Sequence, residues 1–209
     1  MARRATGVVL AAMVLAVGCS QQEKVAPAPP SSDAEVATHA AWSPIAAADM
    51  SEAQNAQRQR ATEAVQTLGG RLMGELTKAL DEGGPAGAID VCRMRAPEIA
   101  AAVSNEYGLV LGRTSFRLRN PSNLPPEWAE DLVREQVADP AWMAGPKGQL
   151  GGLLPIRMKA ECGMCHGPKE QIAPEVLSAL QETYPEDTAT GFHEGDLRGW
   201  FWVEVPAGT

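Results

Sequence analysis

The stretch Cys162-Gly163-Met164-Cys165-His166 constrains the fold and the function more than any other part of this chain. Two thiols three positions apart can each add across a vinyl group of haem, and the adjacent histidine can then bind the iron. This pentapeptide is the attachment signature of c-type haem. The sequence therefore predicts one covalently bound haem c, held by Cys162, Cys165 and His166.

Two other interpretations of this pentapeptide are a disulfide and one half of a zinc site. A structural zinc site needs about four ligands, usually from two pairs. The cysteines outside the pentapeptide are Cys19 and Cys92, and the remaining histidines are His39 and His193. These residues are scattered, so a second half of a zinc site is hard to assemble and thioether-bound haem is favoured.

Residues 1–18 have the pattern of an export signal. Arg3 and Arg4 precede a short apolar run, and Gly18 directly precedes Cys19. The run is too short to span a membrane. A small residue followed by cysteine resembles the processing site of bacterial lipoproteins, in which the new N-terminal cysteine is acylated. The alternative is an ordinary secretory peptide that leaves Cys19 as a free thiol. Bacterial haem attachment also occurs outside the cytoplasmic membrane, so we expect a periplasmic or envelope protein.

Composition divides the rest of the chain into a tether and a folded domain. Residues 19–43 are polar and rich in Ala, Pro and Ser, so they bury too little apolar surface to fold. We expect a flexible tether between a lipid on Cys19 and one haem domain of residues 44–209. The net charge of −8 argues against nucleic acid as a partner and against electrostatic adhesion to anionic lipid. The expected contact with a membrane is therefore the lipid anchor.

Helical patterns dominate the first half of the domain, and strand patterns become frequent in the second half. Apolar residues at helical spacing predict a long N-terminal helix that Gly83-Gly84-Pro85 ends. The other expected elements are helices over 85–95, 97–108, 126–137 and 174–182, strands over 109–111, 115–118, 153–158 and 200–205, and loops over 139–152 and 184–198. This order predicts an α+β fold with an antiparallel sheet.

The second axial ligand of the haem iron is less obvious than the first. No methionine follows His166, and the segment after it is too long for a four-helix cytochrome. The candidates are Cys92, His39, His193 and an upstream methionine. His39 lies in the tether and His193 in a turn-like segment, so we expect both to be solvated. Cys92 lies on an apolar helix face, where a buried cysteine that only fills space is the simpler interpretation.

Several blocks of the sequence, taken in order, resemble a known family. They are Ala88-Ile89-Asp90-Val91-Cys92, Ala96-Pro97-Glu98-Ile99-Ala100, residues 112–123 (GRTSFRLRNPSN), the haem motif, residues 184–191 (YPEDTATG) and residues 195–199 (GDLRG). They are similar to a family of single-haem c-type domains with a PAS-like fold, found alone or fused to sensor kinases. The resemblance covers about residues 46–206, and block 112–123 is its most specific part.

This resemblance implies that Cys92 is the axial partner of His166. It also implies a PAS-like antiparallel sheet with the long N-terminal helix and flanking helices. A thiolate ligand favours ferric iron and lowers the reduction potential relative to methionine. Dissociation of Cys92 from the iron on reduction would open a position for a diatomic gas and move the helix. The two oxidation states would then differ in structure and in free energy, as a switch requires.

Three arginines, Arg113, Arg117 and Arg119, alternate along one segment and would share a face if that segment were a strand. One interpretation pairs Arg113 and Arg117 with the haem propionates, because the arginine fork suits carboxylates. The other is a solvated strand face, and Arg198 carries the same ambiguity. The tryptophans of the second half fit either a pocket wall or an ordinary core.

Two functions from different classes remain. The favoured one is a haem-based redox or gas sensor that reports to a separate signalling protein, because no kinase or cyclase module is found in the sequence. The alternative is an envelope electron-transfer cytochrome, whose partner is another redox protein. No distal acid–base pair accompanies the haem motif, so we do not expect an enzyme.

Overall fold

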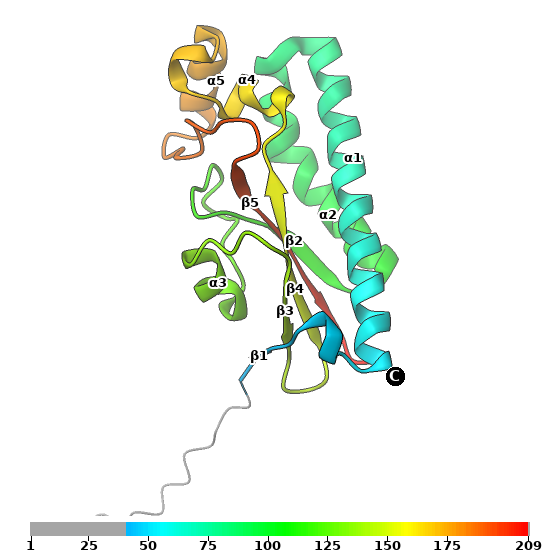
Figure 1. Cartoon of the computed structure of the whole chain (residues 1–209). Coiled ribbons are helices and arrows are strands. Elements are labelled where there is room, and N and C mark those ends of the chain that lie inside the picture. Colours follow the sequence, from blue (N-terminus) through cyan, green and yellow to red (C-terminus); the bar gives the residue numbers. More distant parts are fainter. Residues whose placement is uncertain (1–40, 209) are drawn as a thin grey trace, which may run out of the picture. The chain divides into compact units, whose positions relative to one another are not determined.

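A five-stranded antiparallel sheet with the order β1-β3-β4-β5-β2 forms the centre of the structure, a computed structural model that describes residues 41–208 (Figure 1). The strands are β1 Ser43–Pro44, β2 Val110–Thr114, β3 Ala141–Ala144, β4 Leu150–Arg157 and β5 Leu197–Val205. The predicted signal peptide, Cys19, His39 and residues 19–40 of the predicted tether lie outside the described residues.

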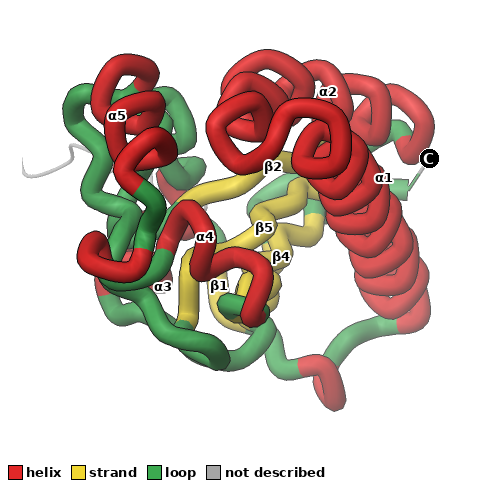
Figure 2. The backbone as a smooth tube through the Cα atoms, turned by 90° about the horizontal axis from the view of Figure 1, so that it is seen from above, coloured by secondary structure: helices red, strands yellow, loops and turns green. Residues whose placement is uncertain are grey.

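Alternating side chains of β5 divide the core between the two faces of the sheet. Val203 and Val205 pack with residues of α1 (Glu52–Asp90) and α2 (Ala96–Tyr107). Trp200 instead packs with Trp128 and Val133, from the short helices η3 (Glu127–Ala129) and α3 (Glu130–Arg134). The sheet is therefore covered on both faces, with the two longest helices side by side on one of them (Figure 2).

The long N-terminal helix begins at a capping box and breaks where the sequence predicts its end. The Ser51 hydroxyl accepts a hydrogen bond from the Gln54 amide at 3.2 Å, and the Gln54 side chain accepts one from the Ser51 amide at 2.9 Å. At Gly84 the backbone has φ 65° and ψ −175°, a region that only glycine tolerates. The chain then resumes as a helix at Pro85, so the predicted end is a kink within α1.

Beyond the kink, the helix carries Cys92 to the site. α1 ends at Asp90 and continues as a π-helix, η2 (Val91–Arg95), which leads into α2. Gly108, with a left-handed φ of 61°, ends α2. Figure 1 shows the chain ascending along α1, turning, and descending through α2.

A group of short helices lies at the end of the sheet near this turn (Figure 1). They are η4 Ala160–Cys162, α4 Gly163–His166, η5 Lys169–Gln171 and α5 Pro174–Thr183. A further short helix, η1 Ala47–Asp49, precedes α1 and is not part of this group. α5 packs through Val176 and Leu180 against Ile89 of α1. The haem motif on α4 is thereby placed beside the part of the helix that carries Cys92.

The predicted α+β class, the antiparallel sheet and the long N-terminal helix are confirmed. The predicted strand 115–118 is wrong: β2 ends at Thr114, and the chain then follows an irregular path. The predicted loop 139–152 is also wrong, because it contains β3 and the start of β4. Gly145 and Gly148 lie in the turn between the two strands, where Gly148 has φ 81°, whereas Gly151 and Gly152 lie within β4. Within residues 41–208, no helix has the length and apolarity needed to cross a membrane.

Candidate cofactor site

A cavity of about 500 Å³ lies between the haem motif and α1, on both sides of the Gly84 kink. Cys162, Cys165 and His166 line one side of it, and Cys92 lines it from η2. The apolar lining includes Met73, Leu76, Leu80, Ala88, Ile89 and Ile156. The structure thus brings together the four residues that the sequence predicts as haem and iron ligands.

The haem motif forms a tight helical turn that presents its side chains to the cavity. η4 and α4 follow one another directly, and the amide of Gly167 donates to the Gly163 carbonyl at 2.9 Å. A β-carbon at Gly167 would lie 2.6 Å from that carbonyl oxygen, so only glycine fits there. Both thiols of the motif are free, and burial raises the pKa of the Cys165 thiol.

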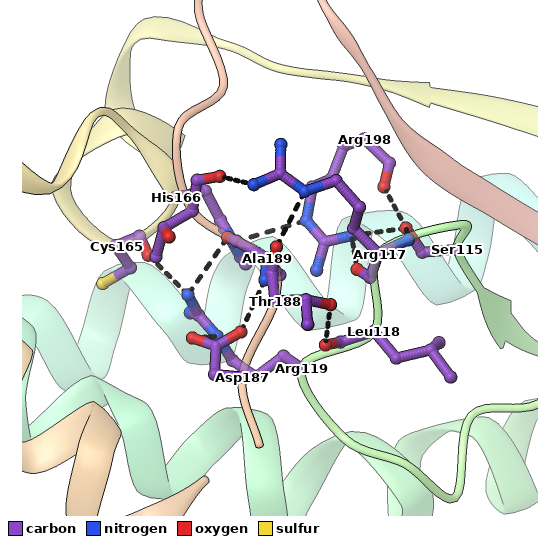
Figure 3. Close-up of polar contacts among 11 residues, drawn as sticks. Ser115, Arg117, Leu118, Arg119, Cys165, His166, Asp187, Thr188, Ala189 and Arg198 are labelled. Atoms are coloured by element: carbon purple, nitrogen blue, oxygen red, sulfur yellow. Dashed lines mark hydrogen bonds and ion pairs between the residues drawn. The ribbon is translucent and has the colours of Figure 1, made fainter. Parts of the chain in front are cut away.

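The imidazole of His166 is held by one strong hydrogen bond. Its Nδ1 lies 2.6 Å from the carbonyl oxygen of Ala189, which can only accept, so Nδ1 carries the proton (Figure 3). The Arg198 Nε lies 3.3 Å from the same Nδ1, but two donors cannot satisfy each other and the shorter contact decides the tautomer. Nε2 is left unprotonated and able to bind a metal.

The electrostatic surroundings keep this imidazole neutral. Burial lowers the pKa of His166 well below its ordinary value of 6.5, and the cationic side chains of Arg119 and Arg198 lower it further. The hydrogen bond to Ala189 opposes this change without reversing it. A neutral imidazole with a free Nε2 is the form that coordinates iron.

Arg113 and Arg198 bring positive charge to the cavity. Both line the cavity, and within residues 41–208 neither forms an ion pair. Burial lowers the pKa of Arg113, and it lowers the pKa of Arg198 to about 10. Next to them, the hydroxyl of Thr114 is buried without a hydrogen-bond partner in the described part of the chain. These groups could hold an anionic part of a ligand.

Arg117 and Arg119 do not share a strand face with Arg113, because both follow the end of β2. Arg117 donates from Nε to the Thr188 carbonyl at 2.8 Å and from Nη2 to the Thr190 carbonyl. Its guanidinium also lies over the ring of Phe192, 4.6 Å from the centroid. Arg117 is not among the residues that line the cavity, so the geometry favours Arg198 over Arg117 as the companion of Arg113.

Other expectations from the sequence concern residues that lie away from the cavity. His193 lies in a turn with its side chain 73% exposed, as predicted. Trp128 and Trp200 belong to the core on one face of the sheet, not to the cavity lining. Within residues 41–208, no three His, Cys, Asp or Glu side chains gather into a metal-ion site, which disfavours the zinc interpretation.

Sequence reasoning missed Thr114, Tyr184, Asp187 and Ala189. Thr114 and Tyr184 line the cavity, the Ala189 carbonyl accepts a hydrogen bond from His166, and Asp187 binds Arg119, which donates to the Cys165 carbonyl. The only signal was indirect: all four of these residues fall within the two blocks, 112–123 and 184–191, that carry the family resemblance. Ala189 acts through its backbone, which side-chain chemistry does not reveal.

Comparison with known proteins relates this arrangement to one family. A family model described as Tll0287-like matches residues 20–206. Among solved structures, the crystal structure of the cyanobacterial heme-protein Tll0287 matches with a TM-score of 0.56 and 23% sequence identity. The match covers 74% of this chain and 97% of that chain, and at this identity it shows a shared fold. No curated protein matches.

Proposed function

Because the chain belongs to the Tll0287-like family, we propose that it binds one haem covalently through Cys162 and Cys165, with His166 and Cys92 as the axial ligands of the iron. One observation carries this proposal: the two free thiols, the imidazole and the Cys92 sulfur all line a single cavity. The solved structure that matches this chain, Tll0287, is of a heme-protein, which supports the same conclusion.

The residues of the cavity fit this group. A volume of about 500 Å³ lies within the range of about 300–1,000 Å³ that is usual for small-molecule and cofactor sites. The apolar lining suits a porphyrin ring. Arg113 and Arg198 would hold the propionates, and the Thr114 hydroxyl, which has no other partner among the described residues, would complete that site.

We propose a haem-based redox or gas sensor as the role of this site. When bound, haem would supply a change of oxidation state or a position for a diatomic gas. The chain contributes two ligands of different mobility: His166 is fixed by Ala189 at 2.6 Å, whereas Cys92 lies in a π-helix, a feature frequent at functional sites. The antiparallel sheet with a long helix on one face supports a PAS-like sensor fold.

The location and partners follow from the N-terminal sequence and are part of the same proposal. Export, acylation of Cys19 and a tether would hold the domain at a membrane of the cell envelope, where a separate signalling protein would receive its signal. The domain itself would catalyse no reaction.

Electron transfer is the second candidate, and one observation favours it. Met164, within the haem motif, is 39% exposed, so the cofactor edge beside it would lie close to the surface. Titration of the reduction potential combined with carbon monoxide binding separates the two roles. A low potential with gas binding on reduction favours sensing, whereas rapid electron exchange with small redox proteins favours electron transfer.

The intact mass of the purified, natively expressed protein tests the proposal itself. We expect the mass of one haem added, residues 1–18 removed and an acyl modification at Cys19. The Cys162→Ala/Cys165→Ala double variant is the control, and it should lack the haem mass. A wild-type protein without added haem mass and without Soret absorbance would contradict the proposal.

A further inference from the structure

A buried ion pair holds the carbonyl group that orients His166 (Figure 3). Arg119 Nε donates to Asp187 Oδ2 at 3.0 Å, and the two side chains are only 8% and 10% exposed. Asp187 Oδ1 accepts from the Ala189 amide at 2.7 Å. Arg119 Nη2 donates to the carbonyl oxygens of Ala189, at 3.3 Å, and Cys165, at 2.5 Å. One guanidinium therefore binds both the turn that carries His166 and the acceptor of its imidazole proton.

We propose that Arg119 and Asp187 are positioning residues that set the orientation of the His166 ring and its strength as an iron ligand. This inference rests on the proposed function and deepens it. The Ala189 carbonyl accepts from both the imidazole and Arg119, so the guanidinium withdraws electron density from the imidazole's acceptor. A weaker acceptor leaves less negative charge on the ring, and Nε2 donates less strongly to iron.

The same contacts prevent the ring and its acceptor from moving apart. The Phe192 amide donates to the His166 carbonyl at 3.0 Å, and the Gly191 amide donates to the Gly167 carbonyl at 2.7 Å. Arg119 also donates to the Cys165 carbonyl. The carbonyls of three consecutive residues, 165–167, are therefore held either by Arg119 or by the segment that follows Ala189. The imidazole is thereby held relative to this segment without any need for a bound group.

Arg117 provides a matched control for Arg119. It belongs to the same segment and donates to the carbonyls of Thr188 and Thr190, on either side of Ala189. None of its hydrogen bonds within the described residues reaches Ala189, Cys165 or His166. Loss of Arg117 would therefore loosen the same loop without changing the imidazole's acceptor.

The test compares Arg119→Lys with Arg117→Lys in the full-length haem protein, in a Cys92→Ala background that removes the competing sulfur. The readouts are the iron–histidine stretching band of the ferrous form and the midpoint potential. One ammonium group cannot bind Asp187 and both carbonyls, so Ala189 would accept more fully from His166. We expect Arg119→Lys to raise the stretching frequency and lower the potential, and Arg117→Lys to leave both unchanged.

An unchanged band in Arg119→Lys overturns this inference, and so do equal shifts in both variants, because equal shifts indicate only a looser loop. Asp187→Asn is a second variant for the case in which Arg119→Lys does not mature. It frees Arg119 to donate more fully to Ala189, so the band should shift in the opposite direction, and an unchanged band again overturns the inference. Absence of haem from the parent protein would instead contradict the proposed function.

Discussion

The two walls of the cavity differ in how firmly they hold the predicted iron ligands. The fixed wall, residues 163–167 with 187–198, has buried hydrogen bonds and the Arg119–Asp187 ion pair. The helical wall, the part of α1 after Gly84 together with η2, carries Cys92. The ion pairs of its η2 arginines, Arg93 and Arg95, join side chains that are each at least 39% exposed. Such exposed pairs contribute little to stability.

This difference suggests a division of roles between the two ligands. His166 on the fixed wall would keep one geometry, because its backbone and its ring are both held. Cys92 lies within the π-helix η2, shortly after the glycine kink, where a change in the helix requires few buried polar contacts to break. A sensor needs one element with two arrangements of similar energy, and the helical wall is the better candidate for it.

The largest expected effect comes from breaking the ion pair of the fixed wall. Asp187→Ala leaves the Arg119 charge buried without its carboxylate, and we expect a loss of about 3–5 kcal/mol in the free energy of unfolding. The matched change on the helical wall is Asp90→Ala, which removes the exposed partner of Arg93 and should cost about 0–1 kcal/mol. Urea denaturation measures both. Similar losses in the two variants would contradict the distinction between the walls.

The kink provides the next largest effect. Gly84 has φ 65° and ψ −175°, so Gly84→Ala should destabilise the fold by about 1–3 kcal/mol. Gly87→Ala is the control, because a β-carbon there meets no atom within 4 Å; in a helix it should stabilise by about 0.5–1 kcal/mol. Thermal unfolding followed by circular dichroism distinguishes the two. A neutral Gly84→Ala would mean that the helix can straighten without cost.

Much of the helical wall could be predicted from the sequence, because its signals are local. Helical spacing of apolar residues, the glycines with Pro85, and Gly108 predict where helices break and end. The π-helix at Val91–Arg95 could not be predicted in this way. Its composition is that of an ordinary helix, so the residue types do not distinguish it.

The fixed wall shows where sequence reasoning fails. The haem motif was evident from spacing alone, but the partner of His166 is a backbone carbonyl that lies 23 residues away. Alternation predicted one shared face for Arg113, Arg117 and Arg119, and it failed because β2 ends at Thr114. After that point, each guanidinium is directed by the carbonyls it binds, and these contacts depend on the tertiary fold.

A smaller effect is expected for Arg113, which faces the cavity between the two walls. Arg113→Gln removes a positive charge that would favour ferrous iron, so the midpoint potential should fall, by about 1 kcal/mol or about 40 mV for one electron. Arg117→Gln is the control, since Arg117 does not line the cavity. Potentiometric titration followed by absorbance measures both. An equal fall in the two variants would indicate a general effect of surface charge and not a propionate site.

The smallest effect on stability is expected for Cys92 itself. Cys92→Ala removes one half-buried sulfur and should change the free energy of unfolding of the haem-free chain by less than about 1 kcal/mol. In the ferric haem protein, however, loss of the sulfur ligand should convert a low-spin absorbance spectrum into a high-spin one. Met94→Ala, on the same π-helix and 54% exposed, should change neither property. A ferric spectrum that stays low-spin in Cys92→Ala would show that Cys92 is not an iron ligand. The helical wall would then lose its proposed part in sensing, because no other sulfur or imidazole of η2 lines the cavity in the described chain.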